Sequence, residues 1–219
     1  MRNLVILGNT PFAERLYYYI SFEGVDKVIA FTQEADYITN GKLHELPVLP
    51  IEELASRIDG DFEIILGIGY TRMNSLRRSL YDMCINNGYK IATYISTNAI
   101  SYTKNIGIGC FIAPGCIIGP SCTLGNGNYL ASSVILSHDN VVGDFNFMST
   151  NSVFGGYSKV GNSCFFGLHS TIKDNIEIAD NNLIGSQTNV LKSIINTGGV
   201  FIGNPARQLV DRESDKITI

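Results

Sequence analysis

The residues of this 219-residue chain that are best suited to chemistry are His138 and Asp139, in the segment "LSHDNVVGD". An imidazole takes up and returns a proton near neutral pH, so His138 could act as a general base and acid. A carboxylate beside it would favour the imidazolium and help to fix the ring tautomer. His44 lies in an irregular segment and His169 in a regular repeat, and we interpret both as packing or surface residues.

Cysteines form a second pattern, because Cys110, Cys116 and Cys122 follow one another at intervals of six residues. A zinc site would require paired spacings such as C-x₂-C, or histidines nearby, and the sequence has neither. The chain has 5 cysteines, which cannot all pair with one another, and free thiols are typical of a reducing compartment. We therefore interpret the cysteines, including Cys164, as small residues that fill a repeated corner.

The six-residue spacing extends well beyond the cysteines as a repeat of large apolar residues. Its members are Ile106, Ile112, Ile118, Leu124, Leu130, Leu136, Val142, Met148, Phe154, Val160, Phe166, Ile172, Ile178, Ile184 and Val190. The residue after most of them is Gly, Ala or Ser. A period of six fits neither an α-helix nor a hairpin array. It is typical of a hexapeptide β-helix, in which each hexad is a short strand and a turn.

This period also places residues far apart in the sequence beside one another. In the left-handed form, three hexads close one coil of about 18 residues, and coils stack at about 4.8 Å. Gly156 follows His138 by one such coil. A glycine permits a close approach, and its N–H can donate to an oxyanion. The sequence therefore predicts a base beside a free amide, which is a workable arrangement for acyl transfer.

The first half of the chain has a different pattern, in which apolar runs alternate with helical segments. We expect strands at 2–7, 26–31, 62–69 and 90–95, a strand and a helix within 46–58, and helices that begin after Thr10 and end at Gly88. This alternation predicts a small parallel α/β sheet, which is Rossmann-like.

Ligands of such sheets bind beyond the carboxyl ends of the strands, which here are Gly8–Phe12, Thr32–Gln33 and Gly67–Tyr70. The first loop, "GNTPFAE", lacks the glycine fingerprint of dinucleotide-binding proteins. The residues leave two interpretations open: a nucleotide site at the amides of Thr10–Phe12, or a domain that only caps the β-helix.

Composition excludes several classes of function. The net charge is −4 and no cluster of Lys and Arg is present, so we expect no nucleic-acid partner. No stretch approaches the roughly 20 apolar residues of a membrane span, and "MRNLVILG" is too short for a secretory signal. We expect a cytoplasmic protein without a membrane partner. Its predicted parts are an α/β domain (1–97), a β-helix (98–203) and a C-terminal tail (204–219).

The hexads, "SHDNVVGD", "FFGLHSTIKDNIEIADNNLIGSQTNVLKSI" and "GVFIGNPAR" together resemble the hexapeptide-repeat acyltransferases. With the α/β part included, residues 1–209 are similar to bacterial sugar-nucleotide N-acetyltransferases, a family often labelled sialic-acid O-acetyltransferase-like. The resemblance implies a left-handed parallel β-helix, acetyl-CoA as co-substrate, no metal, and a homotrimer that binds acetyl-CoA between two prisms. The implied acceptor is a UDP-, dTDP- or GDP-linked amino-dideoxy sugar, with a 4-amino group, for bacterial glycan or O-antigen synthesis.

The resemblance also implies roles for individual residues. His138 would be the general base, Asp139 would raise its basicity, and the amide of Gly156 would bind the acetyl oxygen. The implied cofactor-binding residues are Gly156, Phe147, Leu168 and Ser186, and related enzymes can carry a second histidine at the position of Phe147. The implied substrate-binding residues are Thr10, Pro11, Phe12, Thr32, Gln33 and Gly69. The loop "NTPF" and the pair Thr32–Gln33 depart from the glycine-rich loop and the acidic residues of relatives.

Three alternatives differ in chemistry. An O-acetyltransferase acting on a sugar hydroxyl, as in sialic-acid modification, would use the same histidine on a less acidic group. A non-catalytic nucleotide-binding module would not need His138 at all. A γ-type carbonic anhydrase would bind zinc through three histidines, and the position of His44 outside the β-helix argues against it.

Overall fold

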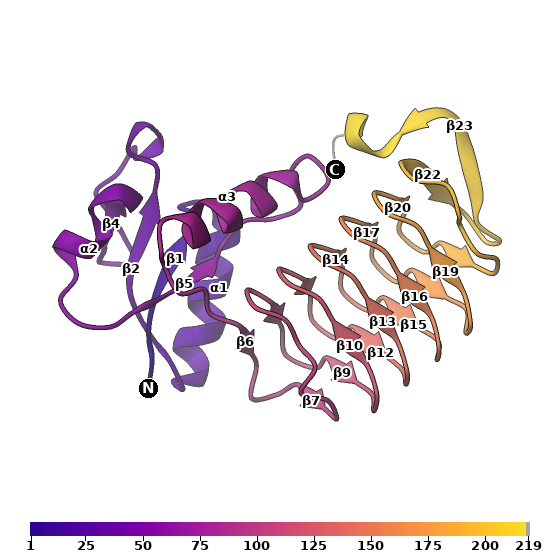
Figure 1. The fold of residues 1–219 in the computed structure, drawn as a ribbon, viewed down its shortest axis with the longest axis horizontal. Helices are drawn as coiled ribbons and strands as arrows, with labels where there is room; N and C mark the ends of the chain where they lie inside the picture. The colour runs from indigo at the N-terminus through magenta and orange to yellow at the C-terminus, as the bar shows by residue number, and fades with distance from the viewer. Residues whose placement is uncertain (218–219) are drawn as a thin grey trace.

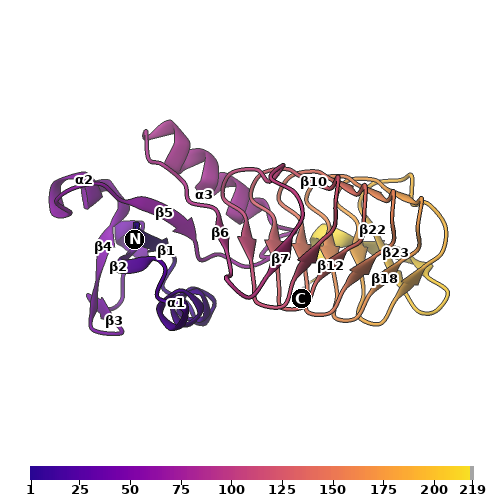
Figure 2. The ribbon, with the colours of Figure 1, turned by 90° about the horizontal axis from the view of Figure 1, so that it is seen from below.

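The computed structural model describes residues 1–217, in which a small α/β domain is followed by a β-helix (Figure 1, Figure 2). The strands of the α/β domain are β1 (Asn3–Leu7), β2 (Lys27–Gln33), β3 (Lys42–Leu43), β4 (Leu46–Pro50) and β5 (Glu63–Leu66). Its helices are α1 (Pro11–Glu23), α2 (Leu54–Arg57) and α3 (Ser75–Asn86), with short 3₁₀ turns η1 (Ala35–Tyr37) and η2 (Ile51–Glu53). In the described residues, none of the helices has the length and apolar character needed to cross a bilayer.

The sheet of the α/β domain has the order β3-β4-β2-β1-β5 and differs from the prediction in two ways. It is mixed, because β3 and β4 form an antiparallel hairpin while the other pairs are parallel. The prediction that residues 90–95 form the last strand of this sheet is wrong. Ile91 forms only an isolated bridge with Ile64, and Tyr94–Ile95 (β6) pairs with β8 of the β-helix instead.

The β-helix consists of three parallel sheets, which we name by what their outer faces carry. The docking sheet contains β6 (Tyr94–Ile95), β8 (Phe111–Ile112), β11 (Tyr129–Leu130), β14 (Phe147–Met148), β17 (Phe165–Phe166), β20 (Leu183–Ile184), β22 (Gly199–Ile202) and the antiparallel β23 (Arg207–Glu213). The apolar sheet contains β7 (Ile100–Ser101), β9 (Ile117–Ile118), β12 (Ile135–Leu136), β15 (Val153–Phe154), β18 (Thr171–Ile172) and β21 (Asn189–Val190). The polar sheet contains β10 (Thr123–Leu124), β13 (Val141–Val142), β16 (Lys159–Val160) and β19 (Glu177–Ile178).

The hexad repeat forms the core of this β-helix, as the sequence predicts. Leu136 pairs with Phe154 and Phe154 with Ile172, so partners in adjacent coils are three hexads apart. Every member of the repeat from Ile112 to Val190 lies in one buried cluster, and the first member, Ile106, packs against it partly buried. Figure 1 shows the coils following one another away from the α/β domain, with β22 and β23 at the far end, from which the chain turns back toward α3 at η3 (Ser214–Lys216).

The cysteines of the repeat are buried free thiols at the corners, as predicted. Cys110, Cys116, Cys122 and Cys164 are each 0% exposed. The Cys110 thiol donates to the carbonyl of Gly125, and the others donate to carbonyls in the same way. Burial raises the pKa of Cys164 to about 12, so this thiol stays protonated at neutral pH. These cysteines are therefore packing residues and not nucleophiles.

A row of aromatic rings joins the β-helix to the α/β domain. On the outer face of the docking sheet, Tyr94, Phe111, Tyr129, Phe147 and Phe165 stack on one another with ring centroids 4.8–5.5 Å apart. This distance is near the strand spacing, since each ring comes from the next coil. Phe12 of α1 packs on the row, with its ring centroid 4.9 Å from that of Tyr129. The contacts of Phe12 with Tyr129 and Phe147 cross between the two parts, and each such pair contributes about 0.5–1.5 kcal/mol beyond burial.

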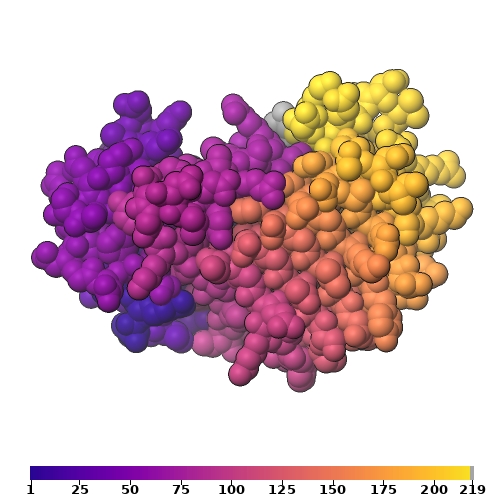
Figure 3. Space-filling model, viewed as in Figure 1, coloured from indigo at the N-terminus to yellow at the C-terminus, as the bar shows by residue number. Residues whose placement is uncertain are grey.

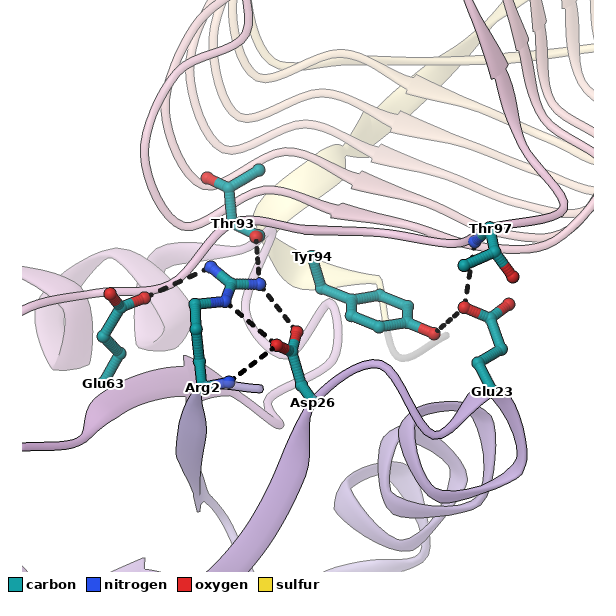
Figure 4. A network of polar contacts seen from close by, with 7 residues as sticks. All are labelled: Arg2, Glu23, Asp26, Glu63, Thr93, Tyr94 and Thr97. Atoms are coloured by element: carbon teal, nitrogen blue, oxygen red, sulfur yellow. Dashed lines mark hydrogen bonds and ion pairs between the residues drawn. The ribbon is translucent and has the colours of Figure 1, made fainter.

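Polar contacts close the edge of the same interface, where the chain passes from the sheet into the first coil (Figure 4). Arg2 forms ion pairs with Asp26 at 2.7 Å and Glu63 at 3.3 Å, and it also donates to the carbonyl of Thr93. Glu23, the last residue of α1, accepts hydrogen bonds from the Tyr94 hydroxyl (2.6 Å), the Thr97 N–H (2.9 Å) and the Ser96 hydroxyl. One carboxylate thus connects α1 to the entrance of the β-helix.

Glu23 should make the stability of the docked protein pH-dependent. Burial alone would raise the pKa of Glu23, but the hydrogen bonds from Ser96, Tyr94 and Thr97 outweigh it and hold the pKa below its usual value of 4.5. The carboxylate therefore stabilises the folded state above pH 4.5, and this contribution is lost as the pH falls through the lowered folded-state pKa.

We expect Glu23→Gln to lower the free energy of unfolding at pH 7 by about 1–2 kcal/mol, after allowance for solvent screening. The difference from the wild type should shrink as the pH is lowered below the pKa of Glu23. Urea unfolding followed by circular dichroism at several pH values would measure it. Glu52→Gln is a suitable control, because Glu52 is exposed in η2. If the difference in free energy of unfolding between the wild type and Glu23→Gln stayed constant down to about pH 3, this role of the charge would be contradicted.

Candidate active site

His138 lies at a corner of the β-helix, between β12 of the apolar sheet and β13 of the polar sheet. Its Nδ1 is 2.9 Å from Oδ2 of Asp139, and the two side chains are 49% and 39% exposed. With the proton on Nδ1 donated to the carboxylate, the lone pair is on Nε2. The imidazole is therefore open to a ligand and has its basic nitrogen free.

Gly156 lies beside His138 on the next coil, as the period predicts. The N–H of Tyr157 donates to the carbonyl of His138 at 3.0 Å, which fixes the two backbones side by side. A Cβ added to Gly156 would be 2.5 Å from Cε1 and 2.6 Å from Nε2 of the imidazole, so any side chain here would displace the ring. Within residues 1–217, the N–H of Gly156 donates to no other group. The structure thus brings together a base and a free amide.

Tyr157 is a third member of this corner that the sequence analysis missed. Its ring is perpendicular to the His138 imidazole, with an interplanar angle of 88° and ring centroids 5.1 Å apart. The side chain is 58% exposed, so it borders the open side of the imidazole. The coil period could have found it, since Tyr157 follows Asp139 by the same number of residues as Gly156 follows His138.

The remaining residues predicted to bind the cofactor lie elsewhere. Leu168 and Ser186 are exposed neighbours on successive coils, at the corner between the docking and apolar sheets. The whole apolar sheet separates them from His138 of the same chain. Phe147 is only 5% exposed and lies in the aromatic row between Tyr129 and Phe165. It offers little surface to a cofactor, so we do not include Phe147 in the site proposed below.

The carboxyl ends of β1, β2 and β5 meet at one edge of the α/β sheet, as expected. The N–H of Gly8 donates to the carbonyl of Thr32, and the N–H of Gly67 donates to that of Leu7, both at 2.8 Å. Thr10 and Pro11, at the start of α1, are exposed there. Thr10 makes no side-chain capping bond, so its hydroxyl is available to a ligand.

The other predicted substrate residues take part in packing. Thr32 is fully buried, and its hydroxyl donates to the carbonyl of Leu49 at 2.8 Å. Phe12 is docked on the aromatic row, and Gly69 lies against the Phe12 ring. Gln33 ends β2, and its buried Oε1 accepts no hydrogen bond from residues 1–217. Among these side chains, only that of Gln33 has a polar atom without a partner in the described residues.

A prominent cleft is separate from both of these regions. It has a volume of about 940 Å³ and lies between the start of α3, the polar–docking corner of the β-helix and the C-terminal segment, where Arg72, Arg78, Ser163, Asn181 and Glu213 line it. Figure 3 shows the C-terminal segment standing at this edge of the molecule, in yellow. Size alone therefore does not identify the reactive site, and the arrangement of chemical groups at His138 does.

The three histidines lie in three separate places. His44, in the β3–β4 turn, stacks on Tyr17 of α1 with ring centroids 4.5 Å apart. His169 is exposed at the docking–apolar corner, far around the prism from His138. Both therefore have the packing and surface positions that we predicted, and the zinc hypothesis has no converging set of histidines in the chain.

No family model matches the chain. Solved structures do match it over almost its whole length. The acetyltransferase domain of PglB from Neisseria gonorrhoeae FA1090, in complex with acetyl coenzyme A, superposes with a TM-score of 0.82 at 19% sequence identity, covering 95% of this chain and 99% of that one. This chain has the fold of that acetyltransferase domain. The predicted combination of a small α/β sheet and a left-handed parallel β-helix is thereby confirmed.

Two further acetyltransferase-fold structures agree. PerB from Caulobacter crescentus, in complex with CoA and GDP-perosamine, has a TM-score of 0.82 at 19% identity over 95% of this chain and 98% of that one. WeeI from Acinetobacter baumannii AYE has a TM-score of 0.73 at 19% identity over 95% of this chain and 100% of that one. The acetyltransferase fold thus includes the α/β domain and does not stop at the β-helix.

Proposed function

We propose that the protein is an acetyl-CoA-dependent N-acetyltransferase that acts on the amine of a nucleotide-linked amino sugar. The observation that carries the proposal is the corner at His138. There, a half-exposed imidazole with its Nδ1 on Asp139 lies beside Gly156 of the next coil, whose N–H has no partner among the described residues. A free base beside a free amide supplies both the proton acceptor and the oxyanion donor of acyl transfer.

The proposed reaction is a direct transfer in a ternary complex. The amine nitrogen attacks the thioester carbonyl, and a C–N bond forms as the C–S bond breaks. Nε2 of His138 takes the proton of the attacking amine and returns it to the departing thiolate. The N–H of Gly156 donates to the carbonyl oxygen as negative charge develops on it, and Asp139 stabilises the imidazolium. The buried, protonated cysteines take no part.

Three lines of support point to these substrates. The PglB domain was solved with acetyl coenzyme A, and PerB with CoA and GDP-perosamine. The bare Gly156 lets the imidazole of His138 lie close to the backbone of the next coil, where a Cβ would be only 2.5 Å from Cε1. The carboxyl edge of the α/β sheet exposes Thr10 and Pro11 to the nucleotide, and the Oε1 of Gln33 at the end of β2 has no partner among the described residues. A UDP-, dTDP- or GDP-linked 4-amino-dideoxy sugar is the acceptor we propose.

We also propose that the active form is a homotrimer that packs through the apolar sheet. The aromatic row already covers the docking sheet, and the polar sheet carries an exposed Lys159–Glu177 ion pair of 2.8 Å. The apolar sheet instead presents Ile100, Ile117, Ile135 and Val153 in register on its outer face, with Ile100 50% exposed. Such a stripe is suited to another copy of the chain. Packing there would bring Leu168 and Ser186 of one copy toward His138 of the next.

Activity on a substrate panel tests the function. Purified protein would be incubated with acetyl-CoA and with UDP-, dTDP- and GDP-linked sugars that carry either an amine or only hydroxyls. We expect release of CoA and a product heavier by one acetyl group with an amino sugar only. Transfer to hydroxyls alone would favour the O-acetyltransferase. Nucleotide binding without turnover of any acceptor would favour a non-catalytic module.

Gly156→Ala gives a more local test of the site. The added methyl group would occupy the space of Cε1 and Nε2, and the imidazole would have to rotate away from the amide. We expect kcat to fall by about 10- to 100-fold, because a displacement of about 1 Å suffices for this. The melting temperature should change little, since a half-exposed side chain can move at small cost. Gly24→Ala is not a matched control, because Gly24 has a φ of 64°; Gly41→Ala is suitable, because a methyl group there meets no atom.

A further inference from the structure

The imidazole of His138 has few contacts that fix its orientation. Its one hydrogen bond is to Asp139, the next residue in the chain, and both side chains are substantially exposed. The Cε1 and Nε2 edge faces Gly156, which has no side chain to hold it. A ring with a single hydrogen bond can still swing about that bond, so a base in this setting requires another contact to keep Nε2 directed at its substrate.

Tyr157 supplies a contact from the adjacent coil. Its backbone N–H donates to the carbonyl of His138, so the two residues are held at fixed separation. Its ring packs perpendicular to the imidazole with centroids 5.1 Å apart, which is a favourable edge-to-face geometry. Asp139, Gly156 and Tyr157 therefore all lie against the imidazole, whose Nε2 has no hydrogen-bond partner among the described residues.

The backbone gives no structural reason for a tyrosine at this position. Tyr157 has a φ of 59°, in the left-handed region that is unfavourable for bulky side chains. Most of the equivalent corner positions are filled by small polar residues with the same conformation, namely Ser121, Ser133, Asp139, Asn151, Ser163, Asn175 and Asn181. The larger exceptions are Phe145, whose ring is buried against Tyr81, and the polar residues His169 and Gln187. Tyr157 is 58% exposed, so core packing does not explain it.

We propose that Tyr157 is a positioning residue, whose ring holds the His138 imidazole with Nε2 directed into the acyl-transfer site. This inference rests on the proposed function, because it assigns His138 the role of base. The contact requires the aromatic ring and not the hydroxyl, since the packing geometry is that of two rings. We therefore expect a phenylalanine in place of Tyr157 to keep the imidazole in place, and a small polar residue to fail to do so.

Two variants separate the ring from the rest of the residue. Tyr157→Phe keeps the ring, and Tyr157→Asn removes it while placing a residue that already occupies equivalent corners at Asn151 and Asn175. We expect Tyr157→Asn to lower kcat about 3- to 10-fold, the range that one aromatic pair can contribute, with the KM for acetyl-CoA within about twofold. Tyr157→Phe should keep the wild-type kcat. His169→Asn, at another left-handed corner position, is the control for the fold.

A spectroscopic measurement keeps this inference distinct from the proposed function. In the free protein, the ring proton and nitrogen resonances of His138 report its tautomer and the ring current of Tyr157, whether or not a substrate is known. We expect them to shift in Tyr157→Asn and to stay in place in Tyr157→Phe. If the wild type is active and Tyr157→Asn has the same kcat and the same His138 resonances, the positioning role is overturned. Shifted resonances in a protein that acetylates nothing would instead overturn the proposed function alone.

Discussion

We expect the His138→Asn variant to lose at least about 100-fold in kcat for acetyl transfer, with little change in the KM for acetyl-CoA. Asparagine is similar in size and can keep a hydrogen bond to Asp139, but its amide takes up no proton at neutral pH. The attacking amine and the departing thiolate would then have to exchange protons with water. Steady-state kinetics with both substrates varied would measure the two constants.

The matched control for this variant is His169→Asn, which removes an exposed imidazole from a different corner. It should retain the wild-type rate, and both variants should unfold at the wild-type urea concentration because both side chains are solvent-exposed. If His138→Asn turned over at the wild-type rate, the site would not be the one that we propose. The binding of a nucleotide sugar without any role for His138 would then be the better description.

The second large effect is expected at Arg77, a residue of α3 that is only 1% exposed. Its guanidinium donates to the carbonyls of Gly69 (2.9 Å), Gly127 (3.1 Å), Asn146 (3.1 Å) and Phe145 (3.2 Å). No carboxylate of the described residues pairs with it. Burial lowers the pKa of Arg77 to about 10, so the group is still charged at neutral pH.

We expect Arg77→Met to lower the free energy of unfolding by about 3–5 kcal/mol, because buried carbonyls from both parts of the chain would lose their donor at once. Arg77→Lys should lose less but remain clearly destabilised, since one ammonium cannot reach all the carbonyls that the planar guanidinium reaches. Urea unfolding would measure the loss, and limited proteolysis would show whether the α/β domain separates from the β-helix first.

Arg78→Met is the control for Arg77, because Arg78 is exposed and only lies over the Phe145 ring, 4.9 Å from its centroid. Its loss should cost about 1 kcal/mol or less. If Arg77→Met lowered the free energy of unfolding by no more than about 1 kcal/mol, the carbonyls would be finding water or other donors. In that case the buried guanidinium would not be what joins α3 to the β-helix.

The amino-acid sequence was sufficient for the β-helix and for the centre of the candidate site. In a six-residue repeat, the distance between two residues along the chain predicts whether they are neighbours in space, because residues three hexads apart lie side by side on adjacent coils. The apolar member of each hexad must therefore point inward, as Phe154 does, and His138 must lie beside Gly156. The same rule would have found Tyr157, had it been applied to the neighbour of His138 as well.

What the tertiary structure alone decided is how the α/β domain meets this rod. Phe147, which the resemblance implies as a cofactor contact, is buried in the aromatic row, and Arg77 of α3 is buried against the β-helix. The strand expected at 90–95 was divided between a bridge to Ile64 and the first coil. These contacts join residues far apart in a part of the chain without a repeat. No periodic pattern marks them, because their partners are selected by the shapes of two folded surfaces and not by local spacing.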